Sequence, residues 1–278
     1  MIVQHNMSAL NTNRQLSITN TNVSKSTEKL SSGYRINRAA DDAAGLSISE
    51  KMRAQIRGLK QASTNAQDGQ SLIQTAEGAM SEIHSVLQRM RELVVQAAND
   101  TNVSTDRKAI AKEVRQLTSE INRIATQTEF NTMKLLSGKF TNKNLQVGAN
   151  GKQKIKISIS KLTAGALGVS TTKIAGVICT KGNGFSKITA LISIVNRAIV
   201  SVSTKRSYLG AIQNRLDHTI SNANNMAENL QSSESKIRDV NMADEMVSYS
   251  SLSILQQAGQ SMLAHANQAT QGVLSLLG

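Results

Sequence analysis

The chain has 278 residues, of which 2% are aromatic, and it contains no Trp and no Pro. A thick globular core normally depends on aromatic area, so this composition argues against one, while the absence of Pro removes the strongest helix breaker. We therefore expect a mainly α protein. No stretch reaches the roughly 18 apolar residues that a membrane span needs, so we expect no membrane span. The N-terminus lacks the pattern of a cleaved signal peptide, which leaves a cytosolic protein or export without such a peptide.

The formal net charge of +13 is concentrated in one segment. Residues 130–216 contain no Asp or Glu and fourteen Lys and Arg together, so the segment carries +14 and the remainder of the chain carries −1. A basic excess raises the question of nucleic acid. However, no aromatic residues for base stacking alternate with the lysines, and no DNA-binding motif is present. We expect no nucleic acid partner and a solvated basic surface.

Residues 1–33 are rich in Asn, Ser and Thr and carry one apolar residue per heptad. This stripe consists of Ile2, Ala9, Leu16, Val23 and Leu30. So thin a stripe among weak helix formers does not hold a helix alone in water. We expect this end to be disordered until a partner covers it, with breaks at Gly33 and Gly45.

The longest helix that the sequence predicts spans residues 46–98. Apolar residues recur there at an average spacing of 3.5, which makes a narrow seam that another helix must cover. The series is Ile48, Met52, Gln55, Leu59, Ala62, Ala66, Gly69, Ile73, Ala76, Met80, Ile83, Leu87, Met90, Val94 and Ala97, in which only Gln55 and Gly69 are out of character. About fifty helical residues span roughly 75 Å, a length that suits a rod.

A second, shorter helix follows a loop at residues 99–105, with Ser104 or Thr105 as its N-cap. Its apolar positions are Ile110, Val114, Leu117, Ile121 and Ile124. A long helix, a short loop and a shorter helix form an antiparallel hairpin. From residue 128 to 188 the helical period disappears, and the alternation in residues 154–160 predicts a strand with one buried face. This segment is interpreted as a small β-containing cap.

Helical period returns at Ile188 and continues to Leu230 as a second seam of rod length. The last helix has the most regular heptad series, formed by Leu252, Leu255, Gly259, Met262, Ala266, Ala269, Val273 and Leu276. An apolar seam so near the C-terminus must be covered, either by residues 1–33 or by another subunit. Seams at both chain ends indicate a part for assembly.

Side chains that carry chemistry are scattered. His5, His84, His218 and His265 lack the spacing of metal ligands, and Cys179 has no His near it in the sequence. The neighbouring Asp41 and Asp42 follow Arg38, and we interpret them as a helix cap or a salt bridge in a turn. We therefore expect no catalytic residue, no metal, no cofactor and no enzyme activity.

Long motifs at both ends resemble the bacterial flagellin family. The N-terminal half contains NTNRQLSITNTNVSKSTEKLSSGYRINRAADDAAGLSISEKMRAQIRGL, QRMRELVVQAANDTN and NRIATQTEFNTMKLLSG. The C-terminal half contains SYLGAIQNRLDHTISN and DVNMADEMVSYSSLSILQQAGQSMLAHANQATQGVLSLL. The resemblance covers residues 1–138 and 190–278, and the short middle segment matches a form without large outer domains.

The resemblance implies a helical coiled-coil rod formed by pairing of N- and C-terminal segments, with a small outer β-containing insert. The implied divisions are a filament-core helix and turn at 1–45, a rod hairpin at 46–137, an outer insert at 138–188, a rod helix at 189–232 and a filament-core helix at 233–278. It also implies a secreted subunit of the flagellar filament that polymerises with itself for swimming motility. The subunit would be exported unfolded through the flagellar channel, and its partners would be an export chaperone, hook-filament junction proteins and cap proteins.

A further partner implied by the resemblance is the vertebrate Toll-like receptor that senses flagellin. The matching positions here are Gln88, Arg89, Leu93 and Glu113. These residues can also be read structurally, because Leu93 adjoins the seam residue Val94 and the charges could simply be solvated. Two other functions stay open: a hook-filament junction or secreted coiled-coil adaptor that does not polymerise indefinitely, and a basic nucleic-acid-binding rod.

Overall fold

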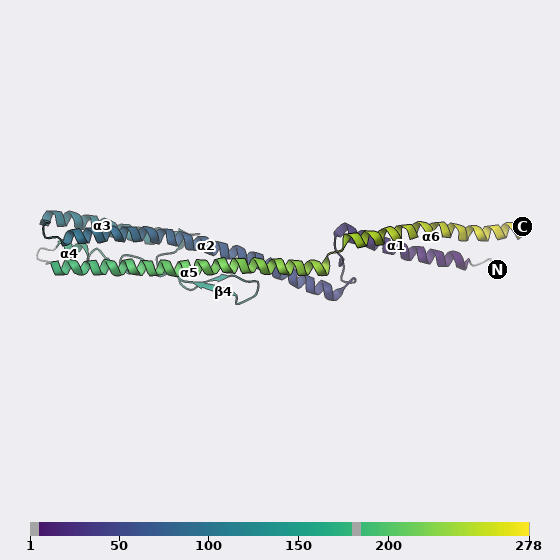
Figure 1. Ribbon diagram of the computed structural model, residues 1–278, viewed down its shortest axis with the longest axis horizontal. Helices are drawn as coiled ribbons and strands as arrows, with labels where there is room; N and C mark the ends of the chain where they lie inside the picture. Colours follow the sequence, from purple (N-terminus) through teal and green to yellow (C-terminus); the bar gives the residue numbers. More distant parts are fainter. Residues whose placement is uncertain (1–5, 180–184, 278) are drawn as a thin grey trace. The chain divides into compact units, whose positions relative to one another are not determined.

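The computed structural model describes residues 6–179 and 185–277 and is dominated by long helices (Figure 1). The elements are α1 (Met7–Ser32), α2 (Ala43–Ala98), α3 (Ser104–Gln127), β1 (Glu129–Phe130), β2 (Met133–Lys134), β3 (Lys143–Gln146), β4 (Lys154–Ile157), α4 (Ala175–Cys179), α5 (Phe185–Arg238) and α6 (Met242–Leu277). The predicted mainly α fold with a small β insert is confirmed. The chain forms two compact units, Arg57–Ala227 and Met1–Ile56 with Glu228–Gly278.

In the unit Arg57–Ala227, α2, α3 and α5 lie side by side (Figure 1). The seam predicted for α2 is the centre of its core: Ile73, Ala76, Met80, Ile83, Leu87, Met90 and Val94 are at most 1% exposed. α3 contributes Val114 and Ile121, and α5 contributes Val195, Val202 and Leu216, all fully buried. Near residue 55 the seam shifts by one position, because Ile56 is buried and Gln55 is exposed. Aliphatic packing therefore stabilises this unit, as the composition predicted.

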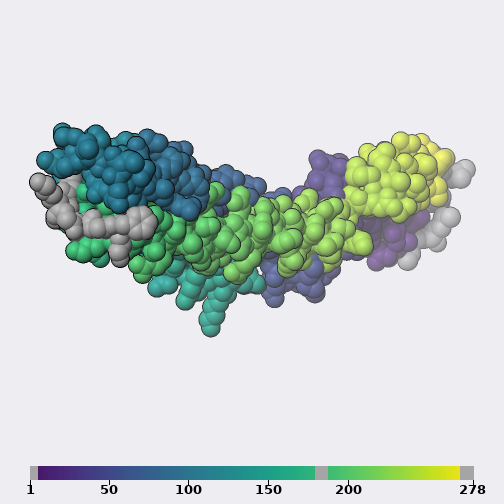
Figure 2. Space-filling view, turned by 60° about the vertical axis from the view of Figure 1, so that its left-hand side comes forward, coloured from purple at the N-terminus to yellow at the C-terminus, as the bar shows by residue number. Residues whose placement is uncertain are grey.

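The insert is not only an outer layer. Its buried side chains Leu135, Leu136, Ile159 and Leu162 belong to the same hydrophobic core as the helices. The predicted strand at 154–160 is shorter than expected, because β4 ends at Ile157 and pairs antiparallel with β3. Beyond it the chain leaves the ladder to fill the core with Ile159. Lysines on the other face of the β3–β4 hairpin remain exposed, and in Figure 2 part of the teal insert projects from the surface below the green α5.

Two glycines of α2 make room for the β3–β4 hairpin. An ideal Cβ on Gly58 would lie 2.9 Å from the Cβ and 3.1 Å from the Cα of Ala149, and one on Gly69 would collide with the side chain of Leu145. A Cβ on Gly78 would meet nothing within 4 Å. The glycines at 58 and 69 thus lower helix propensity and permit close docking of the insert.

Helix ends differ from the expectations by a few residues. α2 begins at Ala43, so Gly45 lies inside its first turn and does not break the chain. α3 begins at Ser104, and the side chain of Asp106 accepts the amide N–H of Val103 at 3.2 Å, in place of a Ser or Thr cap. α5 continues beyond residue 232 to Arg238, and α6 begins at Met242.

α5 is long and apolar enough, by length and composition, to cross a membrane, although the sequence was expected to contain no such stretch. One such helix is weak evidence, because a core helix passes the same test. The apolar side of α5 is used inside the unit, where Ile188, Leu191, Val195 and Ala198 are at most 3% exposed.

The other unit contains the pair of α1 and α6 (Figures 1 and 2). α1 is helical from Met7 to Ser32, the state expected of this end only when a partner covers its stripe. The reason is that α6 covers its stripe, which supplies the partner that a thin apolar stripe requires. α1 ends at Gly33, which adopts a φ of +73° and donates its N–H to the carbonyl of Lys29. That left-handed conformation favours glycine.

Candidate assembly and recognition surfaces

The face of α1 that meets α6 repeats every seven residues. The predicted seam residues Ala9, Leu16, Val23 and Leu30 are all half-buried there. The second position of each heptad is a small polar residue: Thr12 and Thr19 are half-buried and Ser26 is 3% exposed. This explains why the sequence shows only one apolar residue per heptad. Ile2 lies outside the described residues.

Side-chain hydrogen bonds fix the register of α1 and α6. Asn6 Nδ2 donates to the carbonyl oxygen of Ala266 at 2.9 Å, and Gln256 Nε2 donates to Asn20 Oδ1 at 2.9 Å. Because early residues of α1 meet late residues of α6, the two helices run antiparallel. At the other end of α1 the Ser26 hydroxyl donates to a Glu245 carboxylate oxygen at 2.5 Å. Such polar contacts specify an alignment and contribute little net stability.

α6 carries apolar residues on two faces. Leu252, Gly259, Leu263 and Ala266 are half-buried on the face toward α1, and an ideal Cβ on Gly259 would approach the side chain of Leu16 to 3.2 Å. The other predicted seam residues are exposed: Leu255 is 57% exposed, Met262 is 62% exposed and Ala269 is also exposed. The side chains of Val273 and Leu276 are outside those described. The predicted seam therefore divides between a face used within the chain and a face left open.

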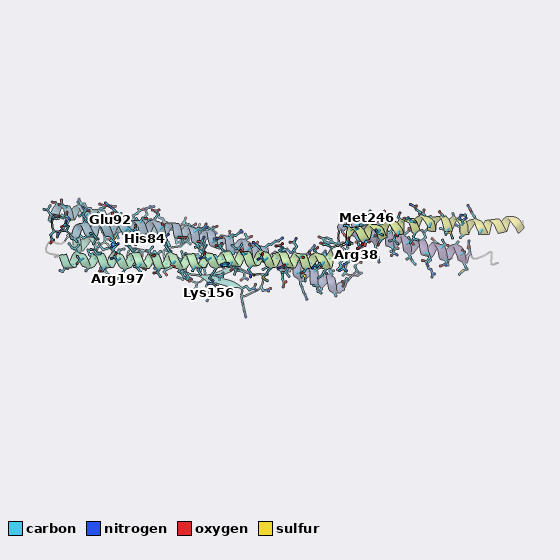
Figure 3. All side chains as sticks on the ribbon, viewed as in Figure 1. Arg38, His84, Glu92, Lys156, Arg197 and Met246 are labelled. Atoms are coloured by element: carbon cyan, nitrogen blue, oxygen red, sulfur yellow. The ribbon has the colours of Figure 1, made fainter. Side chains whose placement is uncertain are left out.

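We call the open side of α6 the exposed α6 face. It comprises Met246, Val247, Ile254, Leu255 and Met262, each between 50% and 68% exposed. Met246 is labelled near the start of α6 in Figure 3. On α1, Met7, Leu10 and Ile18 are also at least half exposed. Apolar residues gathered in this way mark an interaction surface.

An aromatic ring held by two arginines joins the segments between the helices of this unit. Arg53 and Arg238 place their guanidinium carbons 5.5 Å and 4.8 Å from the centre of the Tyr34 ring. Arg53 also donates to the Tyr34 hydroxyl at 3.1 Å and pairs with Glu234 at 3.0 Å. Arg238 pairs with Glu50 at 2.8 Å. We call these five residues the Tyr34 clamp.

Backbone pairing accompanies the Tyr34 clamp. The N–H of Arg35 donates to the carbonyl of Arg238 at 2.6 Å, and the N–H of Val240 donates to the carbonyl of Gly33 at 3.0 Å. The two connecting segments thereby satisfy their own backbone groups. This pairing explains why α5 must continue to Arg238 before the chain turns.

The acidic pair that follows Arg38 has the structural role expected from the sequence. Asp41 accepts the backbone N–H groups of Arg38 and Asn37 at 2.9 and 3.1 Å, and these bonds lower the pKa of the Asp41 carboxyl. Asp42 accepts the N–H of Gly45 at 2.9 Å in the first turn of α2. Both carboxylates therefore act as caps.

The residues expected to bind the receptor are brought together only in part. Arg89 of α2 bridges to Glu113 of α3 at 3.0 Å and to Glu92 at 3.0 Å, on the stretch of α2 where Figure 3 labels Glu92. The hydrogen bond to Glu92, and then that to Glu113, raise the pKa of Arg89. Gln88 is exposed beside them and contacts His84 at 3.0 Å. Leu93 is 2% exposed and lies in the hydrophobic core.

The described side chains form no group of three or more His, Cys, Asp or Glu that could hold a metal ion. The sequence alone predicted neither the Tyr34 clamp nor the burial of the small polar residues of α1. Tyr34 follows a helix-ending Gly33, but the clamp also needs Glu234 and Arg238 from a distant part of the chain, so no local spacing could indicate it. Antiparallel helices with open apolar faces define this chain as a self-assembling structural subunit.

Comparisons with known proteins agree with that class. The model of the bacterial flagellin N-terminal helical region matches residues 3–141, and that of the C-terminal helical region matches residues 192–277. The chain is 54% identical to a flagellin of Halalkalibacterium halodurans and 49% identical to a flagellin of Bacillus subtilis, over the full length of each pair. Bacillus cereus FlgL shares the fold at a TM-score of 0.52 and 14% identity, over 66% of this chain and 99% of its own.

The chain belongs to the bacterial flagellin family. It is a structural subunit of the flagellar filament, which is assembled outside the cell, and the family is one of structural proteins rather than enzymes. The resemblance drawn from the sequence motifs is confirmed.

Proposed function

We propose that this flagellin polymerises by burying the exposed α6 face against neighbouring copies of the chain. One observation carries the proposal: after α1 has covered one side of α6, five large apolar side chains on α6 are still 50–68% exposed. Burying one such side chain contributes about 1.5–3 kcal/mol. A second copy supplies the same kind of surface, as self-assembly requires.

Polar substitutions on the exposed α6 face test this directly. The double variant Leu255→Gln, Met262→Gln should fold as the unsubstituted chain does by circular dichroism, because neither residue is buried within the chain. Its elongation from filament seeds should fall at least about tenfold. Ser250→Gln is the matched control, since Ser250 is exposed and already polar. Elongation at the unsubstituted rate by the double variant would remove this face from the assembly interface.

We also propose that the subunit is exported through the flagellar channel, and the exposed α6 face supports this. The subunit travels unfolded through the flagellar channel, and a dedicated chaperone holds the C-terminal helix before export. Helix-in-groove binding suits an amphipathic helix such as α6. At the ends of the filament the subunit contacts hook-filament junction proteins and cap proteins.

A second function is recognition by the vertebrate receptor that senses flagellin. The supporting observation is that Gln88, Arg89 and Glu113 form one accessible polar surface, with Arg89 already oriented by two carboxylates. Leu93 enters this proposal as a core residue that positions α2, because its side chain is buried.

Arg89→Ala should weaken binding of the monomer to the purified receptor ectodomain by roughly 30-fold, as expected for an arginine at an interface centre. Arg123→Ala is the control, because Arg123 also pairs with an exposed glutamate, Glu120, on the surface of α3. Seeded assembly measured in parallel shows whether the variant remains a competent subunit. An unchanged receptor affinity would exclude Arg89 from the site.

A further inference from the structure

A lysine occupies a core position of α5. The apolar seam of this helix runs through Val195, Ala198, Val202, Leu209 and Ile212, each at most 3% exposed. Lys205 stands between Val202 and Leu209 at the step where the next buried residue belongs. It is half-buried, although a lysine normally carries its charge into water.

The ammonium group of Lys205 has no carboxylate partner among the described residues. Lys205 Nζ donates to the backbone carbonyl of Lys161 at 3.4 Å, a long hydrogen bond. The neighbouring cation in the sequence, Arg206, is paired with Glu77 at 3.4 Å. Burial lowers the pKa of Lys205, because removal from water disfavours the charged form. A larger share of this amine is therefore neutral and nucleophilic.

A cavity of about 380 Å³ opens beside this amine. Met80 of α2, Ile159 of the insert and Leu209 of α5 supply its apolar walls. Tyr208 and Ser160 also line it, and both are exposed. A small apolar body fits such a space, and among the described residues the lysine is the only cation that lines it.

We propose that Lys205 is a covalent modification site for small aldehydes that carry an apolar body. The cavity holds the apolar body, and the lone pair of Nζ attacks the carbonyl carbon. A proton passes from nitrogen to oxygen to give a carbinolamine, and loss of water then leaves an imine. The reaction consumes one amine and one aldehyde and needs no oxidant or reductant. A carboxylate ligand fits less well, because Arg206 is engaged by Glu77 and the described lining contains no second cation.

The test measures the rate of modification at individual lysines of the full-length monomer. The protein is incubated with benzaldehyde at neutral pH, sodium cyanoborohydride reduces each imine to a stable benzyl-lysine, and peptide mapping by mass spectrometry locates the products. Lys205 should react several-fold faster than Lys154 and Lys156, which lie exposed on β4. Equal or slower reaction at Lys205 would overturn the proposal.

Two variants separate the cavity from the amine. Ser160→Phe places a ring at the cavity and should slow benzylation of Lys205, while methylation by formaldehyde, which needs no cavity, should keep its rate. Lys205→Met fills the seam position with an apolar side chain, so it should fold and lose only the fast benzylation. If Ser160→Phe leaves the benzaldehyde rate unchanged, the cavity plays no part and the proposal fails.

Discussion

At the scale of single residues, the Tyr34 clamp of this flagellin joins side chains that are far apart in the sequence. The ring of Tyr34 packs against two guanidinium groups, and each guanidinium is held by a carboxylate: Arg53 by Glu234 and Arg238 by Glu50. Each cation–π contact contributes about 0.5–1 kcal/mol or more when partly desolvated. The Tyr34 clamp therefore stabilises the two connecting segments together with the buried side chain of Ile36, which is 2% exposed.

Tyr34→Leu should loosen these segments without unfolding the unit Arg57–Ala227, which contains none of the five clamp residues. Losing two cation–π contacts and the hydrogen bond to the hydroxyl should open the clamp by about 1–2 kcal/mol. Limited proteolysis at residues 33–42 and 239–241 should then become roughly tenfold faster.

Tyr34→Phe provides the control, because it keeps the ring and loses only the 3.1 Å bond from Arg53. Its cleavage rate should lie between those of the other two proteins. If Tyr34→Leu is cleaved no faster than the unsubstituted chain, the clamp does not hold the segments.

At the scale of elements, the sequence predicted best those helices whose apolar residues recur at a regular spacing. The seam of α2 and that of α3 both appear in the structure because 3.5-residue spacing is a local property of the sequence. For the face of α1 that meets α6, the sequence predicted the apolar residues but not Thr12, Thr19 and Ser26, because small polar side chains are usually exposed. The end of α5 was placed too early, because its extension depends on pairing between Gly33 and Val240, which are distant in the sequence.

The candidate surfaces, like the helices, were predictable from the sequence only in part. The family resemblance named Gln88, Arg89 and Glu113 individually, but the ion pair between Arg89 and Glu113 is known only from the structure. Burial of Leu93 followed from its position beside Val94 on the seam. The division of the α6 seam into an inner and an open face was not predictable. Leu252 and Leu255 are both apolar and only three positions apart, so the sequence does not show which of them faces α1.

Glycines of α2 provide a test of how the insert docks. Gly58→Ala should destabilise the chain although alanine favours helix, because its Cβ would meet the backbone of Ala149 at 3.1 Å. Gly78→Ala is the matched substitution in open space and should stabilise the chain by about 1 kcal/mol. Urea unfolding of both variants measures the two effects. Stabilisation of equal size at the two positions would contradict close docking of the insert.

At the scale of the whole molecule, the two parts of the chain differ in how completely their apolar side chains are buried. The unit Arg57–Ala227 closes its core within one chain, with many side chains fully buried. The terminal helices α1 and α6 leave large apolar side chains half exposed or more. Such a chain is stable as a subunit and gains further apolar burial when copies associate.

The most direct test of this account is electron microscopy of seeded growth by the full-length protein and by a protein lacking residues 252–278. The deletion removes most of the exposed α6 face and leaves every residue of the unit Arg57–Ala227 in place. Full-length protein should extend seeds into filaments, whereas the truncated protein should keep a cooperative unfolding transition and add nothing to the seeds. Growth of the truncated protein at the full-length rate would contradict assembly through the terminal helices.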